Sequence, residues 1–157
     1  MRLLLIAAVS VLLVSCNSAP KQTAADTPKE APAPPPKPVD DSNKFPKPNL
    51  VDTEVTAEDL LGKRFMPGGT IAHYRKGKVE YDMFVARTAS PNDAALVLVD
   101  WRNALADVKF IASFGGYFGN DTGTPVFVFT KGPWIAGIKG LNQKDADLQA
   151  RTLAGAL

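Results

Sequence analysis

The sequence predicts an α+β domain, with an antiparallel sheet of four to five strands and helices packed mainly on one face, after a disordered tether. Three observations lead to this prediction. The stretches 70–87 and 126–138 have the composition and the central turn of β-hairpins. The stretches 90–108 and 142–157 have apolar residues at helical spacing behind a capping residue. A proline-rich stretch comes before all of them and ends near residue 50.

The N-terminus has the features of an export signal. Met1 and Arg2 are followed by a mostly apolar run, 3–14, which ends at the small residue Ser15. A helix that crosses a bilayer needs about 20 apolar residues, so this run is too short to be an anchor. Residues 1–15 are therefore predicted to be a secretory signal peptide.

The end of this run carries a motif. Leu13-Val14-Ser15-Cys16 resembles the lipobox of bacterial lipoprotein precursors. The resemblance implies that a peptidase cleaves between Ser15 and Cys16, that the thiol of Cys16 receives diacylglycerol, and that the new amine is acylated with a chain such as palmitate. Two or three acyl chains hold a protein stably on a membrane. The alternative is an ordinary signal peptide with an incidental cysteine.

The residue after the cysteine bears on localisation. It is Asn17, whereas in the proteobacterial sorting rule an aspartate at this position retains a lipoprotein in the inner membrane. For a cell with two membranes that follows this rule, the resemblance implies the outer membrane, with the protein facing the periplasm.

The counts of cysteine and histidine restrict the chemistry of the chain. Cys16 is the only cysteine and His73 the only histidine. Acylation of Cys16 leaves no thiol for a disulfide, a nucleophile or a thiolate metal site. A single histidine excludes a metal site with two histidines and leaves one base for Ser-His-Asp chemistry. We therefore expect no metal, no cofactor and no catalytic residues, and we predict that the protein is not an enzyme.

Residues 16–50 are predicted to be a lipid-anchored tether. The part 19–50 holds nine of the 13 prolines, and it has too few apolar groups to offset the entropy of ordering it. In polyproline II, at about 3.1 Å per residue, it would reach up to about 90 Å from the membrane. The alternative for Pro34-Pro35-Pro36-Lys37-Pro38 is a ligand for a proline-binding module.

Residues 51–157 are predicted to be a single small domain with one core. They carry 12 Lys and Arg against 12 Asp and Glu, so their formal charges balance. Because no basic stripe is present, nucleic-acid binding has no electrostatic basis, and no nucleic-acid partner is expected.

The first two elements of this domain come before residue 88. Thr56-Ala57-Glu58-Asp59 resembles a capping sequence and predicts a short helix that ends at Gly62. The hairpin over 70–87 is expected to turn at Lys76-Gly77, which pairs Tyr74 with Val79 and places His73 opposite Glu80. We interpret His73 as a solvated strand residue rather than a base.

The next elements alternate between helix and strand. Ser90-Pro91-Asn92-Asp93 predicts a helix start, with a capping hydroxyl, a proline at the first position and an acidic residue. The stretch 126–138 is apolar on both faces and turns at Lys131-Gly132-Pro133. A last helix begins near Asn142. We expect Phe127, Phe129, Trp134 and Ala136 to lie under the helices, and the apolar stripe of the first long helix to be Ala94, Val97, Leu98, Trp101, Leu105 and Val108.

The stretch Gly115–Gly123 is predicted to be a flexible loop that presents aromatic side chains. Within it, Asp121-Thr122-Gly123 resembles the signature of aspartic peptidases, in which two carboxylates share a proton. The sequence departs from that family, because no apolar strand precedes Asp121 and no second copy of the motif exists. A turn explains the same residues. The candidate binding residues are Tyr117, Phe118, Asn120 and Asp121.

Three functions are compatible with these observations. The first is a lipid-anchored, non-catalytic binding or scaffolding module of the bacterial envelope, whose protein partner docks on the loop 115–123 or on the open sheet face. The second is a receptor for a small apolar ligand held between sheet and helices. The third is a hydrolase that uses Asp121 or His73. The sequence predicts no particular oligomeric state.

Overall fold

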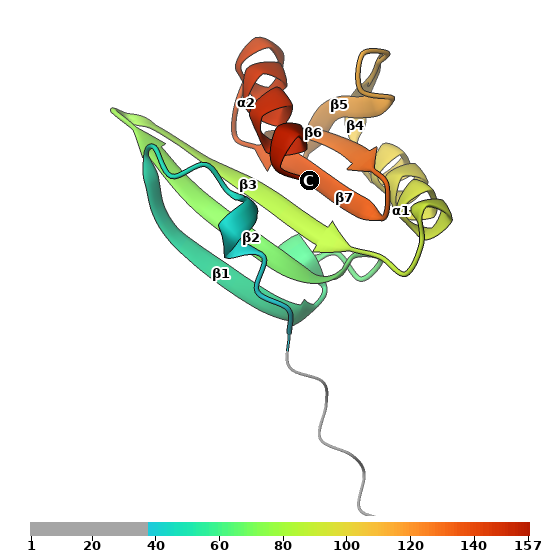
Figure 1. The fold of residues 1–157 in the computed structure, drawn as a ribbon. Coiled ribbons are helices and arrows are strands. Elements are labelled where there is room, and N and C mark those ends of the chain that lie inside the picture. The colour runs from blue at the N-terminus through green and yellow to red at the C-terminus, as the bar shows by residue number, and fades with distance from the viewer. Residues whose placement is uncertain (1–37) are drawn as a thin grey trace, which may run out of the picture. The chain divides into compact units, whose positions relative to one another are not determined.

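A computed structural model describes residues 38–157. The predicted signal peptide, the predicted lipid site at Cys16 and the predicted tether as far as Lys37 lie outside the described residues. The described chain forms a seven-stranded antiparallel sheet in the order β1-β2-β3-β7-β6-β5-β4, with two α-helices (Figure 1). The elements are β1 (Leu50–Glu58), β2 (Pro67–Lys76), β3 (Val79–Arg87), α1 (Pro91–Ala104), β4 (Ala106–Ile111), β5 (Gly116–Asp121), β6 (Thr124–Lys131), β7 (Trp134–Lys139) and α2 (Gln143–Ala156), with short 3₁₀ turns η1 (Ser42–Lys44) and η2 (Leu60–Gly62).

The prediction of an α+β domain with an antiparallel sheet is confirmed, but the sheet has seven strands rather than four to five. The additional strands lie where the sequence predicts other structure. Residues 50–58 form edge strand β1 instead of a tether end and a helix start, and only η2 follows it. Residues 106–121 form the hairpin of β4 and β5. Pairing with neighbouring strands therefore outweighs the local capping and loop signals.

The hairpin of β2 and β3 forms, with a register that differs by two residues from the predicted one. Tyr74 pairs with Tyr81 and Lys76 pairs with Val79, so that Gly77 and Lys78 make the turn. A shift of two residues leaves every side chain on its predicted face, because side chains alternate with a period of two.

The helices cover opposite faces of the sheet, so the prediction that they pack mainly on one face is wrong. α1 buries Leu98 and Trp101 against Val126, Val128 and Ile135. α2 buries Ala146, Ala150 and Leu153 against Phe127 and Phe129 on the other face. Successive side chains of β6 belong alternately to these two clusters. Both sets of side chains are apolar because a helix packs on each face of the sheet. The predicted division of β6 and β7 side chains between the faces is correct.

The pairing of β3 with β7 joins the two halves of the sheet. Phe84 of β3 lies opposite Gly137 of β7, and a Cβ atom at Gly137 would lie 2.4 Å from the Phe84 ring. The same ring stacks on Trp101 of α1, with 5.8 Å between the centroids. A glycine is required here because the ring occupies the place of its side chain.

Both helices begin as predicted. The Ser90 hydroxyl accepts a hydrogen bond from the Asp93 backbone N–H at 3.1 Å, and Pro91 is the first helical residue. The Asn142 side chain accepts the equivalent bond from Asp145 at 3.1 Å. α1 ends at Ala104, so Val108 belongs to β4 and not to the apolar stripe of the helix.

Residues 38–50 pack on the domain, so the predicted boundary at residue 51 lies too late in the chain. Phe45 is 3% exposed and belongs to the cluster under α2. The Tyr74 hydroxyl donates a hydrogen bond to the Pro46 carbonyl at 2.8 Å, and burial raises the pKa of Tyr74 above its ordinary value. The Asp41 backbone N–H donates to the Thr70 hydroxyl at 3.0 Å. We call residues 38–49 the arm.

If the arm is part of the fold, Phe45→Ala should lower the free energy of unfolding by about 3 kcal/mol, because the truncation leaves a cavity in the core. Val51→Ala is the control, since Val51 is 60% exposed and should change stability by less than about 0.5 kcal/mol. Chemical denaturation of both variants measures the difference. Equal stability of the two would show that the Phe45 side chain does not stabilise the core.

Candidate functional site

The predicted binding loop is a strand. Residues 116–121 form β5, which pairs with β4 on one side and β6 on the other. Only Thr122 and Gly123, both with positive φ, make a tight turn into β6. The glycines that indicate a loop in the sequence allow close strand packing instead, since a Cβ at Gly116 would lie 2.3 Å from the Val128 carbonyl oxygen. Residues 116–121 are therefore a paired strand and not part of a flexible loop.

Tyr117 and Phe118 are neighbours in β5, so they point to opposite faces of the sheet. Tyr117 is half-buried against the cluster under α1, and its ring centroid lies 5.6 Å from that of Phe110. Phe118 is half-buried against the cluster under α2. The two rings do not share one binding surface.

Asn120 and Asp121 hold neighbouring segments to β5. The Asn120 side chain donates to the Asp107 carboxylate at 3.2 Å. Asp121 is 5% exposed and accepts a hydrogen bond from the Lys63 ammonium at 2.6 Å. That ammonium also lies 5.6 Å from the centre of the Trp101 ring. The Asp121 carboxylate is thus occupied by an ion pair that fixes the β1–β2 connection to the sheet.

His73 lies on a charged strip of the β2–β3 hairpin. Its Nδ1 is 2.7 Å from the Asp82 carboxylate, and its Nε2 is 3.8 Å from that of Glu54. Arg75 donates to Glu80 at 2.8 Å beside it. A histidine oriented by a carboxylate is the general-base part of a Ser-His-Asp triad. The side chains that line the adjacent hollow of about 230 Å³ include no serine, threonine or cysteine to act as the nucleophile.

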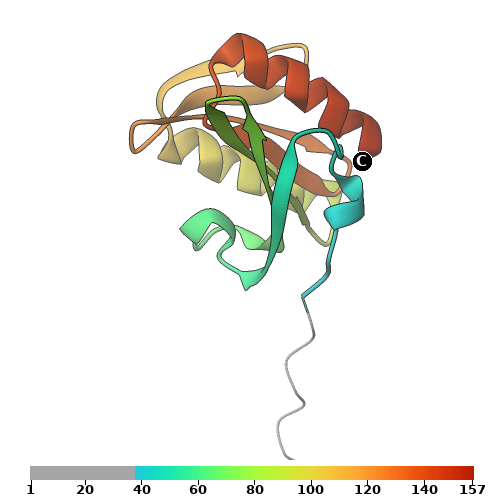
Figure 2. The ribbon, with the colours of Figure 1, turned by 90° about the vertical axis from the view of Figure 1, so that its left-hand side faces the viewer.

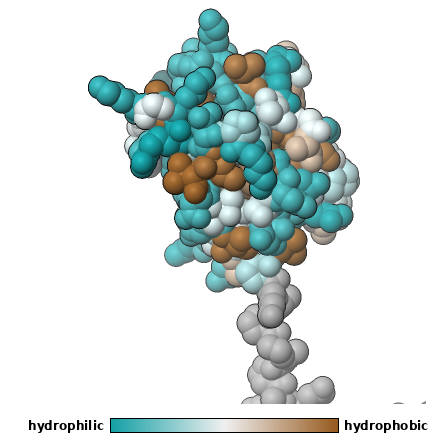
Figure 3. All heavy atoms as spheres, turned by 60° about the vertical axis from the view of Figure 1, so that its left-hand side comes forward, coloured by the Kyte–Doolittle hydropathy of each residue, from teal (hydrophilic) through white to brown (hydrophobic). Residues whose placement is uncertain are grey.

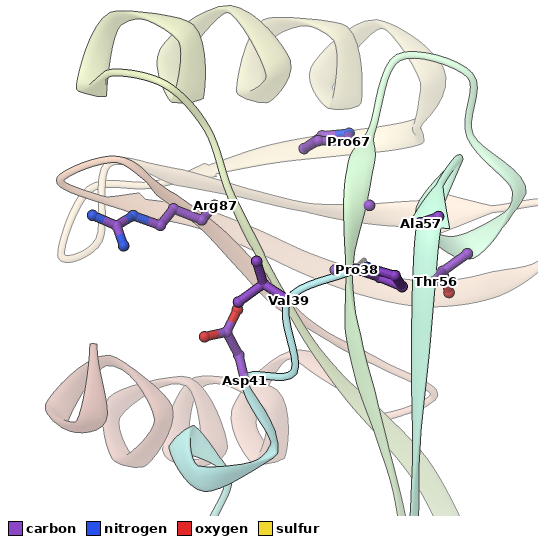
Figure 4. Close-up of a pocket in the computed structure, with 9 residues that line it drawn as sticks. Pro38, Val39, Asp41, Thr56, Ala57, Pro67 and Arg87 are labelled. Carbon is purple, nitrogen blue, oxygen red and sulfur yellow. The ribbon is translucent and has the colours of Figure 1, made fainter. Parts of the chain in front are cut away.

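The hollow in Figure 4 lies between the arm and the ends of β1 and β2. It has a volume of about 270 Å³, and Pro38 and Val39 form part of its wall. Burial raises the pKa of Asp41, whereas Lys44 and Arg87 act in the opposite direction. The Arg87 guanidinium points away from Thr56 and Ala57 in Figure 4. A third hollow, of about 300 Å³, lies between α2 and the tip of the β2–β3 hairpin.

The strand β1 forms one edge of the sheet, and its outer side has no strand partner among residues 38–157. In Figure 2 it lies at the near side of the molecule. Asp52, Glu54 and Glu58 are exposed on it, and exposed Asp59 follows. We call β1 with these four carboxylates the acidic edge. The sequence signal for it is the absence of any Lys or Arg between Lys47 and Lys63.

The strand β4 forms the opposite edge and differs from β1 in length and regularity. It has six residues, and its register with β5 shifts between Ala106 and Lys109. Asp107 has a φ of 52° within this irregular part. A short strand, a bulge and an exposed lysine are features that protect edges from further pairing.

Some large apolar side chains are exposed on the described surface. The face in Figure 3 is mainly hydrophilic, with separate hydrophobic patches. Leu96 on α1 is 65% exposed, Leu148 on α2 is 62% exposed and Phe110 on β4 is 61% exposed. They lie on three different elements, and exposed Val99 and Val108 lie near Leu96 and Phe110 on α1 and β4. Small separate groups of this kind are common on protein surfaces and do not by themselves indicate a docking surface.

Residues 38–157 contain no group of three or more His, Cys, Asp or Glu side chains placed to hold a metal ion. The two α-helices of this part of the chain have 14 residues each, and neither is long and apolar enough to cross a bilayer.

The chain was compared with family models, with curated proteins and with solved structures, and none of the three comparisons found a match.

Because Asp121 is paired with Lys63, we expect Asp121→Asn to lower the free energy of unfolding by about 2 kcal/mol, since the neutral amide takes away the negative charge that faces the largely buried Lys63 ammonium. The variant should still fold. A double-mutant cycle with Lys63→Met measures the coupling, and Asp100→Asn on the exposed side of α1 is the control. A coupling near zero would show that the ion pair does not stabilise the fold.

Proposed function

We propose that this chain is a lipid-anchored protein of a bacterial envelope, and that its folded domain is a non-catalytic module that binds an envelope protein. The anchor is proposed at Cys16, and residues between it and the arm would serve as the tether. The observation that carries the proposal is the lipobox-like sequence Leu13-Val14-Ser15-Cys16 behind a charged start and an apolar run.

The proposed membrane is the outer one, with the domain in the periplasm. Asn17 supports this in a cell with two membranes that follows the aspartate rule. The acyl chains on Cys16 would supply the membrane affinity, because burial of each methylene contributes about 0.8 kcal/mol.

The binding role is supported by the acidic edge. An open strand offers a row of backbone donors and acceptors to a partner, and β1 extends over nine residues. This surface replaces the stretch 115–123 as the candidate, because Asp121 is ion-paired to Lys63 and the rings of Tyr117 and Phe118 lie on opposite faces.

The two alternatives have less support. A receptor for an apolar ligand needs a concave site of about 300–1,000 Å³ that encloses the ligand, and the three hollows described above measure about 230–300 Å³ and open to the surface. A hydrolase that uses Asp121 would have to break its ion pair with Lys63.

The anchor is tested by Cys16→Ser in cells fed a labelled fatty acid. The variant should take up no label and should accumulate as an unprocessed or mislocalised precursor, because Cys16 is the only thiol in the chain. Ser18→Ala is the control and should be labelled as strongly as the natural chain. Equal labelling of the Cys16→Ser chain would contradict the proposed lipid attachment.

A further inference from the structure

We infer that the acidic edge binds an extended segment of a partner protein that carries lysine or arginine at alternating positions, and that this segment pairs with β1 as an eighth strand. Strand addition of this kind obtains affinity from backbone hydrogen bonds and specificity from alternating side chains. The inference rests on the proposed binding function, and it names the surface and the chemistry of the partner.

The first reason is the regularity of β1. From Asp52 to Glu58 its register with β2 contains no bulge. The backbone groups on the outer side of these residues therefore have the regular spacing of a strand. The irregular part lies between Leu50 and Asp52, at the start of the strand. β1 is thus the longer of the two edges, and its regular part runs from Asp52 to Glu58, whereas the regular part of β4 runs only from Lys109 to Ile111.

The second reason is that β1 repels a copy of itself. An antiparallel pair of β1 strands about Glu54 places Glu54 against its own copy. A pair about Val55 places Asp52 against Glu58, and a pair about Thr56 places Glu54 against Glu58. Like charges directly opposite each other destabilise a strand pair. The charges therefore block self-association while leaving the backbone free for a partner of opposite charge.

The third reason is charge complementarity. Asp52, Glu54 and Glu58 are an even number of residues apart, so they lie on the same face of the regular strand. Neighbouring Arg75 is bound to Glu80. Glu54 lies 3.8 Å from Nε2 of His73, but among residues 38–157 no Lys or Arg forms an ion pair with these three carboxylates or with Asp59. Basic side chains at every second position of an added strand would lie against this row.

The test uses the whole chain purified in detergent and three capped nine-residue peptides, at low ionic strength. The basic peptide TKVKTKVKT should bind, as measured by fluorescence anisotropy. The peptide TKPKTKPKT has the same charge but cannot form a regular strand, and TEVETEVET has the opposite charge. We expect both to bind at least about tenfold more weakly. Hydrogen exchange of β1 amides should slow only with TKVKTKVKT.

Two variants with equal changes in charge locate the site. Glu58→Lys should weaken binding of TKVKTKVKT about tenfold, because it places a like charge in the added pair. Asp100→Lys lies on α1 and should change binding by less than about twofold. Equal effects of the two variants would overturn the inference, because they would show a general response to net charge.

Equal affinity for TKVKTKVKT and TKPKTKPKT would also overturn it, as would the absence of binding. Either result would leave fatty-acid labelling at Cys16 unaffected, whereas loss of labelling would overturn the anchor and leave peptide binding in place. The two proposals therefore fail separately.

Discussion

The architecture depends on the pairing of β3 with β7. The chain forms one meander of β1, β2 and β3 and another of β4 to β7, and residues 82–87 pair with residues 134–139 to make them one sheet. The seam is close-packed, because the Phe84 ring lies on Gly137 and against Trp101. Both faces of this seam are buried, so another element has to pack on each face. α1 follows β3 and α2 follows β7, and they cover opposite faces.

Some of this fold can be predicted from local patterns. The alternation of Val126, Phe127, Val128 and Phe129 assigns each side chain to its face. In the β2–β3 hairpin the same kind of alternation holds although the predicted register is wrong by two residues. Helix starts are local as well, since Ser90 and its bonded partner are only three residues apart. A strand that is apolar on both faces is predicted to have another element packed on each face, but the pattern does not say which helix packs on which face.

The errors concern contacts between distant residues. Asp121 and Lys63 are 58 residues apart, so "NDTG" alone has the composition of a turn and does not reveal the ion pair. The arm is rich in proline, and its packing depends on Phe45 entering the core and on the Tyr74 hydroxyl reaching Pro46. Residues 56–59 resemble a capping sequence, but pairing with β2 makes 56–58 the end of strand β1. In each case a tertiary contact outweighs a local preference.

The proposed anchor and the acidic edge have complementary consequences. An added strand of about nine residues forms few contacts beyond its backbone bonds, and ordering it costs conformational entropy. Such a contact is weak between freely diffusing proteins. Attachment to the same membrane as the partner raises the effective concentration, and binding then needs less affinity at the edge. A charged edge also excludes copies of the same chain, which attachment would concentrate equally. If the chain is anchored as proposed, an edge that repels its own copies would limit self-association on the membrane, and the row of carboxylates on β1 would supply that repulsion.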